Sequence, residues 1–496
     1  MVDVVVAGAG PVGLMLACEL ALGGVKVVVL ERREDIDQTI KAGSLNAPTI
    51  EALERRGLTP ALREAAETTM AAFAAFQKTQ PSFQQTQPPN GAPKQRKFAG
   101  HFGGIMLDAG DLDPADERLA AAGRLGATAI VSQQQLEAIL QARALELGVD
   151  LRRGVAITGF AEEADAVVVR TSGGTLRAGW LVGCDGGRSL VRKLAGFEFP
   201  GTEPEITAYQ ALADLEGTSG LRPGWHATDA GVYSFGPVPG RVLVAEFGGR
   251  PSDRDAPVTE AELQGAIRRV TGVDVEVKGI RTVTRFTDNA RQATTYRKGR
   301  VLLAGDAAHV HSPFGGQGLN LGIGDAMNLG WKLAATVRGW APAGLLDSYT
   351  AERHPIGAWV LDWTRAQIAI MRPDRHARAL RQVLADLAGT TDGATYLVTR
   401  LSGVWQGYDL PGDHPLTGRP APDLELSDGT RLADRLHGGK ALLLNAKADG
   451  YEDRLTHAIA EGAPRMLVRP DGYVAWASDT QDADLAPWLG RPTCSR

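Results

Sequence analysis

The stretch LLAGDAAHVHSPFGGQGLN, residues 302–320, brings an acid, two histidines, a proline and several glycines close together. Carboxylate and imidazole are common metal ligands, so Asp306, His309 and His311 first suggest a metal site. Their D-x-x-H-x-H spacing matches no zinc pattern, and no further ligand cluster stands elsewhere in the sequence. We therefore predict no metal, and we expect both histidines to be structural side chains that bond backbone carbonyls at turns.

The pattern GAGPVG near the N-terminus could bind phosphate groups. Gly8, Gly10 and Gly13 stand between an expected strand and an expected helix, where glycine permits a tight turn and lets phosphates approach the N–H groups that begin the helix. Glu31 ends the next apolar run, at the place where an acid accepts the hydroxyls of an adenosine ribose. This unit predicts dinucleotide binding, but it does not separate FAD from NAD.

Two later turns repeat the arrangement of an acid near the end of an apolar strand. In GCDGGRSLVRKLAG, Asp185 follows the strand and a helix is expected over 188–194. In the stretch quoted first, a strand over 301–304 precedes Asp306, and a helix is expected from about Leu319. Either turn could be a plain strand-to-helix connection. Three such turns in one chain nevertheless indicate a single large ligand.

Hydrophobic periodicity predicts the elements that position these turns. Residues 71–96 are rich in Gln, Pro and Thr, and we assign them no element. Residues 206–286 are strand-like with a helix at about 260–270, which predicts an inserted mixed sheet. A mostly helical run follows to about residue 404, then a Pro- and Gly-rich linker, then a small α/β module from residue 424. In the first part we expect strands over 2–7, 25–30, 149–152 and 166–170, and helices over 11–22, 47–56 and 132–147.

Composition narrows the class of ligand and of location. The 496 residues carry a net charge of -5 without a long basic run, which disfavours nucleic acid and anionic membranes and favours small molecules. No apolar run reaches the ~18 residues that span a bilayer, so we predict a cytoplasmic protein. Cys18, Cys184 and Cys494 lie far apart, which fits a reducing compartment and argues against a disulfide or zinc framework.

Taken together, GAGPVG with Glu31, CDGGRSLVR and GDAAHVHSPFGGQGLNLGIGDAMNLGWKLA resemble the FAD-dependent aromatic hydroxylases. These are single-component flavin monooxygenases of the para-hydroxybenzoate hydroxylase fold, and the resemblance runs in register from about residue 2 to 365. RQATTYRKGRVLLAGDAAH and VRPDGYVAW are most similar to the branch that oxidises aromatic polyketides. The resemblance implies an α/β fold: a Rossmann-like FAD-binding domain, an inserted mixed β-sheet substrate domain, and a C-terminal thioredoxin-like α/β module.

The resemblance also implies domain limits. The FAD-binding domain with its helical extension would take residues 1–175, 176–200 and 287–408. The substrate domain would take residues 201–286 with parts of 71–125, and the thioredoxin-like module residues 409–496. Thioredoxin chemistry needs two nearby thiols, and only Cys494 lies in this module, so we expect a structural or interfacial role for it.

Roles for single residues follow from the same resemblance. Asp306 would bond the ribityl hydroxyls of FAD, and amides at a helix N-terminus would face the flavin pyrimidine, where reduced flavin is negative. Pro313 would lie against the isoalloxazine and shape the reaction pocket. Asp185 and Gly186 match a motif tied to both FAD and the nicotinamide cofactor. The implied cofactor-binding residues are Gly8, Gly10, Pro11, Val12, Gly13, Glu31, Arg32, Lys41, Gln133, Asp185, Gly186, Asp306, Gly318, Leu319 and Asn320.

Two features depart from or qualify the family pattern. Lys41 stands where many relatives have an Arg, which keeps a point charge but loses a planar fork, so cofactor contact there is in question. No second GxGxxG unit could hold NAD(P)H in a domain of its own. Members of this family bind that cofactor transiently on the FAD domain.

The implied reaction is reduction of FAD by NADPH or NADH, capture of O₂ as a flavin C4a-hydroperoxide, and transfer of one oxygen to a phenolic ring. Tyr233 and Phe235 could cover the substrate, although sheet-core packing explains them equally well. No residue is assigned as general base. Alternatives are a Baeyer-Villiger or epoxidising enzyme on the same scaffold, and a non-catalytic binder of flavin or an aromatic metabolite. We expect a monomer or homodimer without nucleic-acid or membrane partners.

Overall fold

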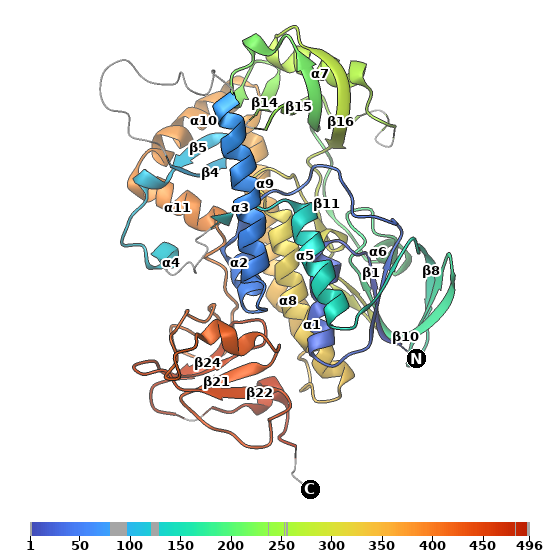
Figure 1. Cartoon of the computed structure of the whole chain (residues 1–496), viewed down its shortest axis with the longest axis vertical. Coiled ribbons are helices and arrows are strands. Elements are labelled where there is room, and N and C mark those ends of the chain that lie inside the picture. Colours follow the sequence, from blue (N-terminus) through green and yellow to red (C-terminus); the bar gives the residue numbers. More distant parts are fainter. Residues whose placement is uncertain are drawn as a thin grey trace.

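A central α/β part carries a smaller sheet at one end and a C-terminal module at the other, as the computed structural model shows (Figure 1). The chain starts in the central part, and its C-terminus lies beyond the module at the lower end of the view. Within the described ranges, no helix combines the length and the apolar character that crossing a bilayer would require. The structure describes residues 2–79, 97–120, 128–236, 238–251, 253, 256–481 and 483–493.

The central sheet has a parallel core that places three strand ends at one edge. Strand β1 (Val2–Ala7) pairs in parallel with β2 (Val27–Glu31) on one side and with β10 (Gly174–Gly183) on the other. Strand β19 (Val301–Leu303) extends the sheet beyond β10, again in parallel. The carboxyl ends of β1, β10 and β19 therefore meet, and each leads into one of the three glycine turns found in the sequence.

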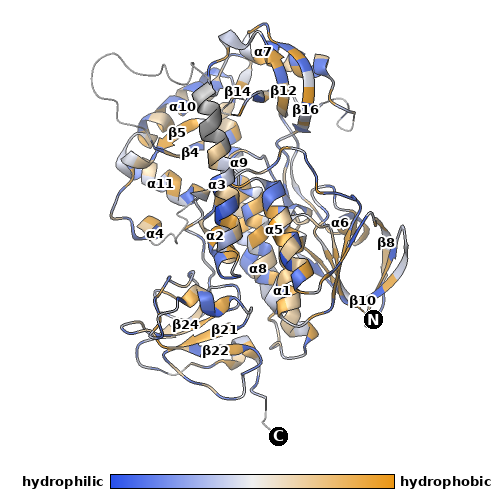
Figure 2. Cartoon of the chain, in the orientation of Figure 1, coloured by the Kyte–Doolittle hydropathy of each residue, from blue (hydrophilic) through white to orange (hydrophobic). Residues whose placement is uncertain are grey.

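Two helices that cover this sheet are almost fully buried. Helix α1 (Pro11–Leu22) packs on α8 (Gly318–Val337), and most residues of both are buried. Their close approach requires small residues, since a Cβ at Gly330 would lie 2.3 Å from the Cβ of Glu19. The apolar residues of α8 and β10 stand out in orange in Figure 2. The predicted strand over 2–7 and helix over 11–22 are confirmed to the residue.

The other predicted elements of the central part agree with the structure within a few residues, and the structure adds short elements that were not predicted. Helix α5 (Gln133–Glu146) starts at the capping box of Ser132 and Gln135. Helix α3 (Thr59–Thr79) reaches into the segment to which the sequence assigns no element, and residues 80–96 lie outside the described residues. The other elements are β3 (Leu45–Asn46), α2 (Ala47–Glu54), α4 (Glu117–Ala120), β6 (Thr128–Ala129), β7 (Asp150–Arg153), β8 (Ile157–Glu162), β9 (Val167–Thr171), α6 (Leu190–Leu194), β11 (Gly201–Thr202), β17 (Ala290–Gln292), β18 (Arg297–Lys298) and β20 (His309–Val310).

A five-stranded sheet forms the inserted part, with helix α7 (Glu260–Thr271) on one face. Leu263, Ile267 and Val270 of the helix pack into the cluster that includes Val242 and Val244 of the sheet. All neighbouring strands run antiparallel, so the predicted mixed sheet is wrong in this respect; short hairpins join two of the four neighbouring pairs. The strand order is β13 (Gly224–Ala227), β14 (Gly231–Phe235), β15 (Arg241–Glu246), β12 (Thr207–Glu216) and β16 (Glu276–Phe286).

A hairpin from the first half of the chain packs on the helices that follow α8. The ring centroid of Phe102, in this hairpin, lies 4.6 Å from that of Trp363 inside an apolar cluster. The segment therefore belongs with these helices as much as with the inserted sheet. The hairpin strands are β4 (Phe98–Phe102) and β5 (Ile105–Asp108), and the helices are α9 (Ser348–Met371), α10 (Arg375–Ala388) and α11 (Thr391–Leu401).

The C-terminal module is a four-stranded sheet with short helical turns. Its first two strands are parallel and the other pairs antiparallel, and the predicted turn at Asp471 and Gly472 joins the last two strands. Cys494 lies outside the described residues. The order is β22 (Leu455–Ala458), β21 (Ala441–Leu444), β23 (Arg465–Val468) and β24 (Val474–Ser478), followed by α12 (Ala486–Leu489).

Buried charges attach this module to the central part. Arg469 of the module donates to both carboxylate oxygens of Glu352 on α9, at 3.0 and 2.8 Å, and also pairs with Asp471. From the other side, Arg56 donates to the carbonyls of Leu436 and Pro470 at 2.8 and 2.7 Å. Both guanidinium groups are almost fully buried. Separating the module from the central part would therefore leave charged groups without their partners, which is unfavourable.

We expect Arg469→Met to destabilise the protein by about 3–5 kcal/mol, because it leaves the carboxylates of Glu352 and Asp471 buried with too little positive charge. The free energy of unfolding from urea titration measures this effect. Arg281→Met removes an exposed partner of Asp214 and serves as the control, with an expected change below ~1 kcal/mol. Equal effects in the two variants would contradict the clamp.

Candidate functional site

The first and second glycine turns, residues 8–13 and 184–189, touch through their backbones. Gly8 has φ +103°, and a Cβ there would lie 2.5 Å from the carbonyl oxygen of Cys184. A Cβ at Gly13 would lie 2.0 Å from the carbonyl oxygen of Gly8. Glycine is therefore required at both positions for the strand ends to approach so closely.

The third glycine turn, residues 304–320, closes onto the other two. A Cβ at Gly305 would lie 3.0 Å from Cγ2 of Val12, so this turn packs directly on the start of α1. The buried Arg192 donates to the carbonyl of Gly187 in the second turn at 2.8 Å and to that of Ala307 in the third at 3.0 Å. The structure thus joins the three turns into one surface.

A cavity of about 2180 Å³ opens above this surface and continues to the face of the inserted sheet that α7 leaves uncovered. Typical ligand pockets enclose roughly 300–1,000 Å³. The cavity is therefore large enough for a dinucleotide together with a second organic ligand. Residues of the turns line one part, and residues of the inserted sheet and of the hairpin β4–β5 line the other.

Two carboxylates from the turn region face this cavity. Glu31 at the end of β2 accepts the N–H of Ala9 at 2.9 Å and that of Arg33 at 2.9 Å, which fixes the carboxylate beside the first turn. Asp306, which looks buried in the sequence because it follows an apolar strand, is exposed and lines the cavity. Both are hydrogen-bond acceptors for hydroxyl groups of a ligand.

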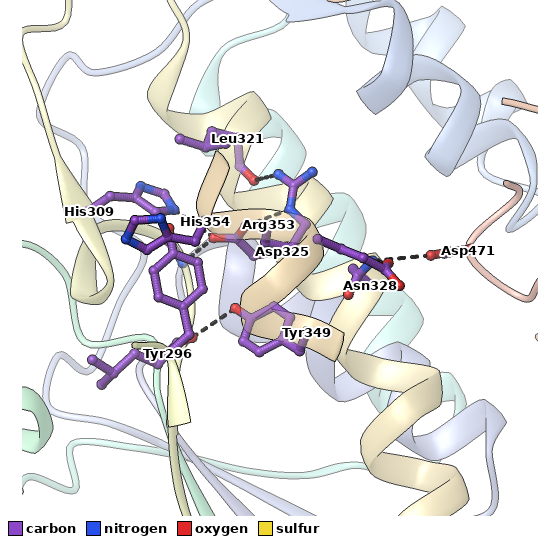
Figure 3. A network of polar contacts seen from close by, with 12 residues as sticks. Tyr296, His309, Leu321, Asp325, Asn328, Tyr349, Arg353, His354 and Asp471 are labelled. Carbon is purple, nitrogen blue, oxygen red and sulfur yellow. Dashed lines mark hydrogen bonds and ion pairs between the residues drawn. The ribbon is translucent and has the colours of Figure 1, made fainter. Parts of the chain in front are cut away.

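Asp325 of α8 holds the third turn from behind, as Figure 3 shows. It has no exposed surface, and its Oδ2 accepts the N–H of Gly305 at 3.0 Å and contacts Nε2 of His309 at 2.7 Å. Its Oδ1 accepts from Nε of Arg353 at 2.8 Å, and Arg353 also donates to the carbonyl of Leu321 at 2.9 Å. Burial alone would raise the pKa of Asp325, but His309 and Arg353 together hold it below its usual value.

The same network continues toward the C-terminal module. Asn328, one turn further along α8, donates to Glu352 at 2.6 Å and to Asp471 of the module at 3.5 Å. Tyr349 donates to the carbonyl of Leu303, the last residue of β19, at 2.8 Å. Helices α8 and α9 therefore carry two neighbouring groups of buried polar contacts, one to the third turn and one to the module.

Neither histidine of the third turn sits in a metal-binding cluster. The Nδ1 of His311 lies 2.7 Å from the carbonyl of Ser312, as expected for a structural histidine, whereas His309 bonds the carboxylate of Asp325 instead of a carbonyl. Burial lowers the pKa of His311. Within the described residues, no group of three or more His, Cys, Asp or Glu is placed to hold a metal ion.

The N-terminus of α8 opens into the cavity without a side-chain cap. Gln317 occupies the cap position, but its side chain accepts no bond from the first turn. Asn320 braces the loop, since it donates to the carbonyl of Gly316 at 2.8 Å and accepts the N–H of Asn46 at 3.0 Å. The first-turn amides of a helix have no partner inside the helix, so those from residue 318 to 320 are placed to donate to an anionic ligand.

Most residues assigned by sequence meet at the cavity. Gly13 does not line it and serves packing, as described above. Tyr233 does not line it either, because its side chain lies in the cluster below α7. The assigned residues that do line it are Gly8, Gly10, Pro11, Val12, Glu31, Arg32, Lys41, Gln133, Asp185, Gly186, Asp306, Pro313, Gly318, Leu319, Asn320 and Phe235.

Lys41, the departure from the family pattern, pairs with Asp37 at 2.7 Å at the rim of the cavity. Burial acts to raise the pKa of Asp37, but hydrogen bonds from Lys41 and Thr39 outweigh it and lower the pKa. The positive charge at this position is therefore partly neutralised before any ligand arrives.

The part of the cavity below the inserted sheet has aromatic walls that single-residue patterns do not indicate. The ring of Phe314 lies edge-on to Trp225 at 5.8 Å and to Phe286 at 5.9 Å. Gln210, on the inner strand β12, lines the same cavity. Flat aromatic ligands pack well on such walls.

The residues around the turns fit an FAD molecule. A Cβ at Gly10 would meet nothing within 4 Å, so the backbone there is open to a phosphate. The Oδ1 of Asp185 is buried with no partner in the described part of the chain, while its Oδ2 accepts the N–H of Leu190 at 2.7 Å. An unpaired buried acceptor beside two glycine turns is the arrangement that a hydroxyl-rich dinucleotide would complete.

We expect Asp306→Ala to weaken FAD binding by about 10- to 100-fold without changing the melting temperature of the apoprotein, since its carboxylate is exposed in the cavity. Asp325→Asn should lower both the affinity for FAD and the melting temperature of the apoprotein, because it leaves the cation Arg353 buried without a counter-charge. Fluorescence titration with FAD and thermal unfolding of the apoproteins measure the two effects. Identical behaviour of the two variants would show that the network does not support the turn.

The buried His101 gives the protein a specific pH dependence. Burial, aided by the nearby charge of Arg381, lowers its pKa from 6.5 to about 4. The unfolded chain therefore binds more protons between pH 6.5 and 4, and stability falls as the pH is lowered through this window, by up to ~1.4 kcal/mol per pH unit from this group. Urea unfolding at pH 7, 6 and 5 should show a flatter profile for His101→Phe; an unchanged profile would refute the assignment.

Comparison with known proteins identifies two matching families and full-length relatives. The model for the FAD binding domain matches residues 1–364, and that for the aromatic-ring hydroxylase C-terminal region matches residues 414–492. The 12-dehydrotetracycline 5-monooxygenase/anhydrotetracycline 6-monooxygenase of Streptomyces rimosus is 39% identical over 539 residues, covering 99% of both chains. Rifampicin monooxygenase of Streptomyces venezuelae is 39% identical over 512 residues, covering 99% of this chain and 100% of that protein.

Solved structures agree with these matches. OxyS, the anhydrotetracycline hydroxylase from Streptomyces rimosus, superposes with a TM-score of 0.83 at 39% identity and covers 99% of this chain and 100% of its own. The predicted fold class and family resemblance are thereby confirmed. The chain belongs to the FAD-dependent aromatic-ring hydroxylases, and it is a flavin monooxygenase that uses NAD(P)H as co-substrate.

Proposed function

We propose that this enzyme hydroxylates an aromatic polyketide or a related polycyclic phenol. One observation carries the proposal: a single cavity joins the three glycine turns to a compartment walled by Trp225, Phe286 and Phe314. Polycyclic aromatic molecules can fill such a compartment while their reacting ring faces the flavin end. The relatives named for anhydrotetracycline and rifampicin support the same substrate class.

When bound, FAD supplies the redox and oxygen chemistry, and the protein orients the reactants. In this proposal Glu31 accepts the hydroxyls of the adenosine ribose, and Asp306 accepts those of the ribityl chain. The amides at the start of α8 face the flavin pyrimidine, where main-chain donors stabilise negative charge without a proton transfer. Pro313 shapes the floor between the two ligands.

The aromatic compartment has a second task in this proposal, which is to exclude water. The clustered rings of Trp225, Phe286 and Phe314 remove polar contacts from the wall next to the substrate. Exclusion of water strengthens the electrostatic interactions in the site and suppresses side reactions. No side chain is assigned to deprotonate the phenol.

The nicotinamide cofactor is proposed to bind transiently near the second glycine turn. Asp185 and Gly186 lie at the cavity surface beside α6. The chain has no second GxGxxG unit, which agrees with a docking site on the FAD-binding part itself.

The proposal predicts that the FAD-loaded enzyme consumes NADPH faster when polycyclic phenols such as hydroxyanthraquinones are added. Mass spectrometry after reaction under ¹⁸O₂ should show one labelled oxygen on a ring carbon of the product. A labelled oxygen in an ester or epoxide would instead indicate Baeyer-Villiger or epoxidising chemistry. NADPH consumption that no member of the panel stimulates, with no labelled product, would refute the proposal and favour a non-catalytic binder.

A further inference from the structure

Arg241 places a positive charge on the cavity face of the inserted sheet. It is the first residue of β15, where Val242 and Val244 point into the cluster under α7. By strand alternation, Arg241 and Leu243 point the opposite way, and both line the cavity. The guanidinium therefore lies on the same face as the aromatic compartment.

The polar surroundings of Arg241 leave its charge without an opposite one. In the part of the chain that the structure describes, its guanidinium forms neither an ion pair nor a side-chain hydrogen bond. The neighbouring strands contribute neutral polar groups to the cavity lining, namely Gln210, Ser234 and Thr284. Asp214 of β12 stands on the same face by strand alternation, but it lies outside the cavity and pairs with Arg281. Among the described cavity residues of β12 to β16, none is acidic.

Several other arginines of the molecule have the carboxylate partner that Arg241 lacks. Arg291, which also lines the cavity, pairs with Glu203, and the buried Arg353 and Arg469 each have carboxylate partners. Burial lowers the pKa of Arg241, yet a guanidinium remains protonated at physiological pH. Partly removing such a charge from water is unfavourable unless a ligand later provides the missing partner.

We propose that Arg241 binds an anionic oxygen of the substrate, either a carboxylate or the oxygen of an acidic phenol or enol. The side chain thereby selects acidic polycyclic substrates over neutral ones of the same shape. This inference rests on the proposed function, because it assigns a substrate to the same compartment. The planar fork of arginine suits a carboxylate or a pair of adjacent oxygens, which a lysine ammonium would bind only as a point charge.

A phosphate of NAD(P)H has the same chemistry and could reach an open cavity. The surroundings favour the substrate, because Arg241 belongs to the inserted sheet that also carries Trp225 and Phe286, whereas the glycine turns that suit phosphates belong to the central part. The experiment includes an arm that separates the two ligands.

The test uses the FAD-loaded full-length enzyme and two probes, a hydroxyanthraquinone carboxylic acid and its methyl ester. Binding is measured as the change in flavin absorbance during titration, which requires no turnover. We expect Arg241→Gln to raise the Kd of the acid by at least about tenfold and that of the ester by less than about twofold. Arg241→Lys should recover part of the affinity for the acid.

Arg269→Gln is the matched control. It removes one positive charge from α7, on the opposite face of the same sheet and outside the cavity, and should leave both Kd values unchanged. The FAD content of each variant verifies that it is folded.

Three results would overturn the assignment: equal affinity of the wild type for acid and ester, an equal loss of both in Arg241→Gln, or a raised KM for NADPH with unchanged binding of the acid. If Arg241 had a merely structural role, Arg241→Gln would weaken the binding of both probes equally. If the enzyme did not hydroxylate the probes, the ratio of the Kd values for acid and ester could still be measured. The two proposals can therefore fail separately.

Discussion

A buried carboxylate bonded to a main-chain amide is the interaction on which the site depends. Asp325 receives the N–H of Gly305, the imidazole of His309 and the guanidinium of Arg353, and it is completely removed from solvent. An unpaired carboxylate in that position would cost several kcal/mol, so the partners must come together when the fold forms. The third glycine turn is therefore held in one conformation before any cofactor binds, and Asp306 next to Gly305 is presented to the cavity.

Close backbone approach is the second constraint, and it acts where the three glycine turns meet. Gly8, Gly13 and Gly305 allow strand ends and helix starts to touch where any Cβ would collide with a main-chain or side-chain atom. Packing density in such contacts leaves little room for adjustment. The glycine contacts and the Asp325 network together fix the spacing of three loops that are far apart in the chain.

The C-terminal module extends this rigid core rather than adding chemistry to it. Asn328 and Glu352 on the central helices connect to Asp471 and Arg469 of the module, all through buried polar contacts. Paired buried groups such as Glu352, which accepts from both Arg469 and Asn328, fix the geometry of the helices that carry them. The module can thus support a distant site through the helices that it contacts.

Local patterns were sufficient for much of the fold and for the class of cofactor. The glycine turn around Gly8 and the acid Glu31 depend on residues that are neighbours in sequence, so their strand-turn-helix arrangement can be predicted from spacing alone. Helix limits such as those of α1 follow from the same short-range rules. The long motif after Asp306 resembles one family closely enough to indicate the flavin chemistry as well.

Tertiary structure decided which of these residues act together and which way each one points. Tyr233 faces α7 while Arg241 faces the cavity, and only strand register and sheet packing distinguish the two sides. The pairing of Asp325 with Arg353 joins two helices whose contact no periodicity predicts. The sequence by itself therefore determined the dinucleotide-binding unit, because that unit depends on local order, and it indicated FAD and the enzyme family through a long resemblance, whereas the binding surface for the substrate arose only where distant segments pack against each other.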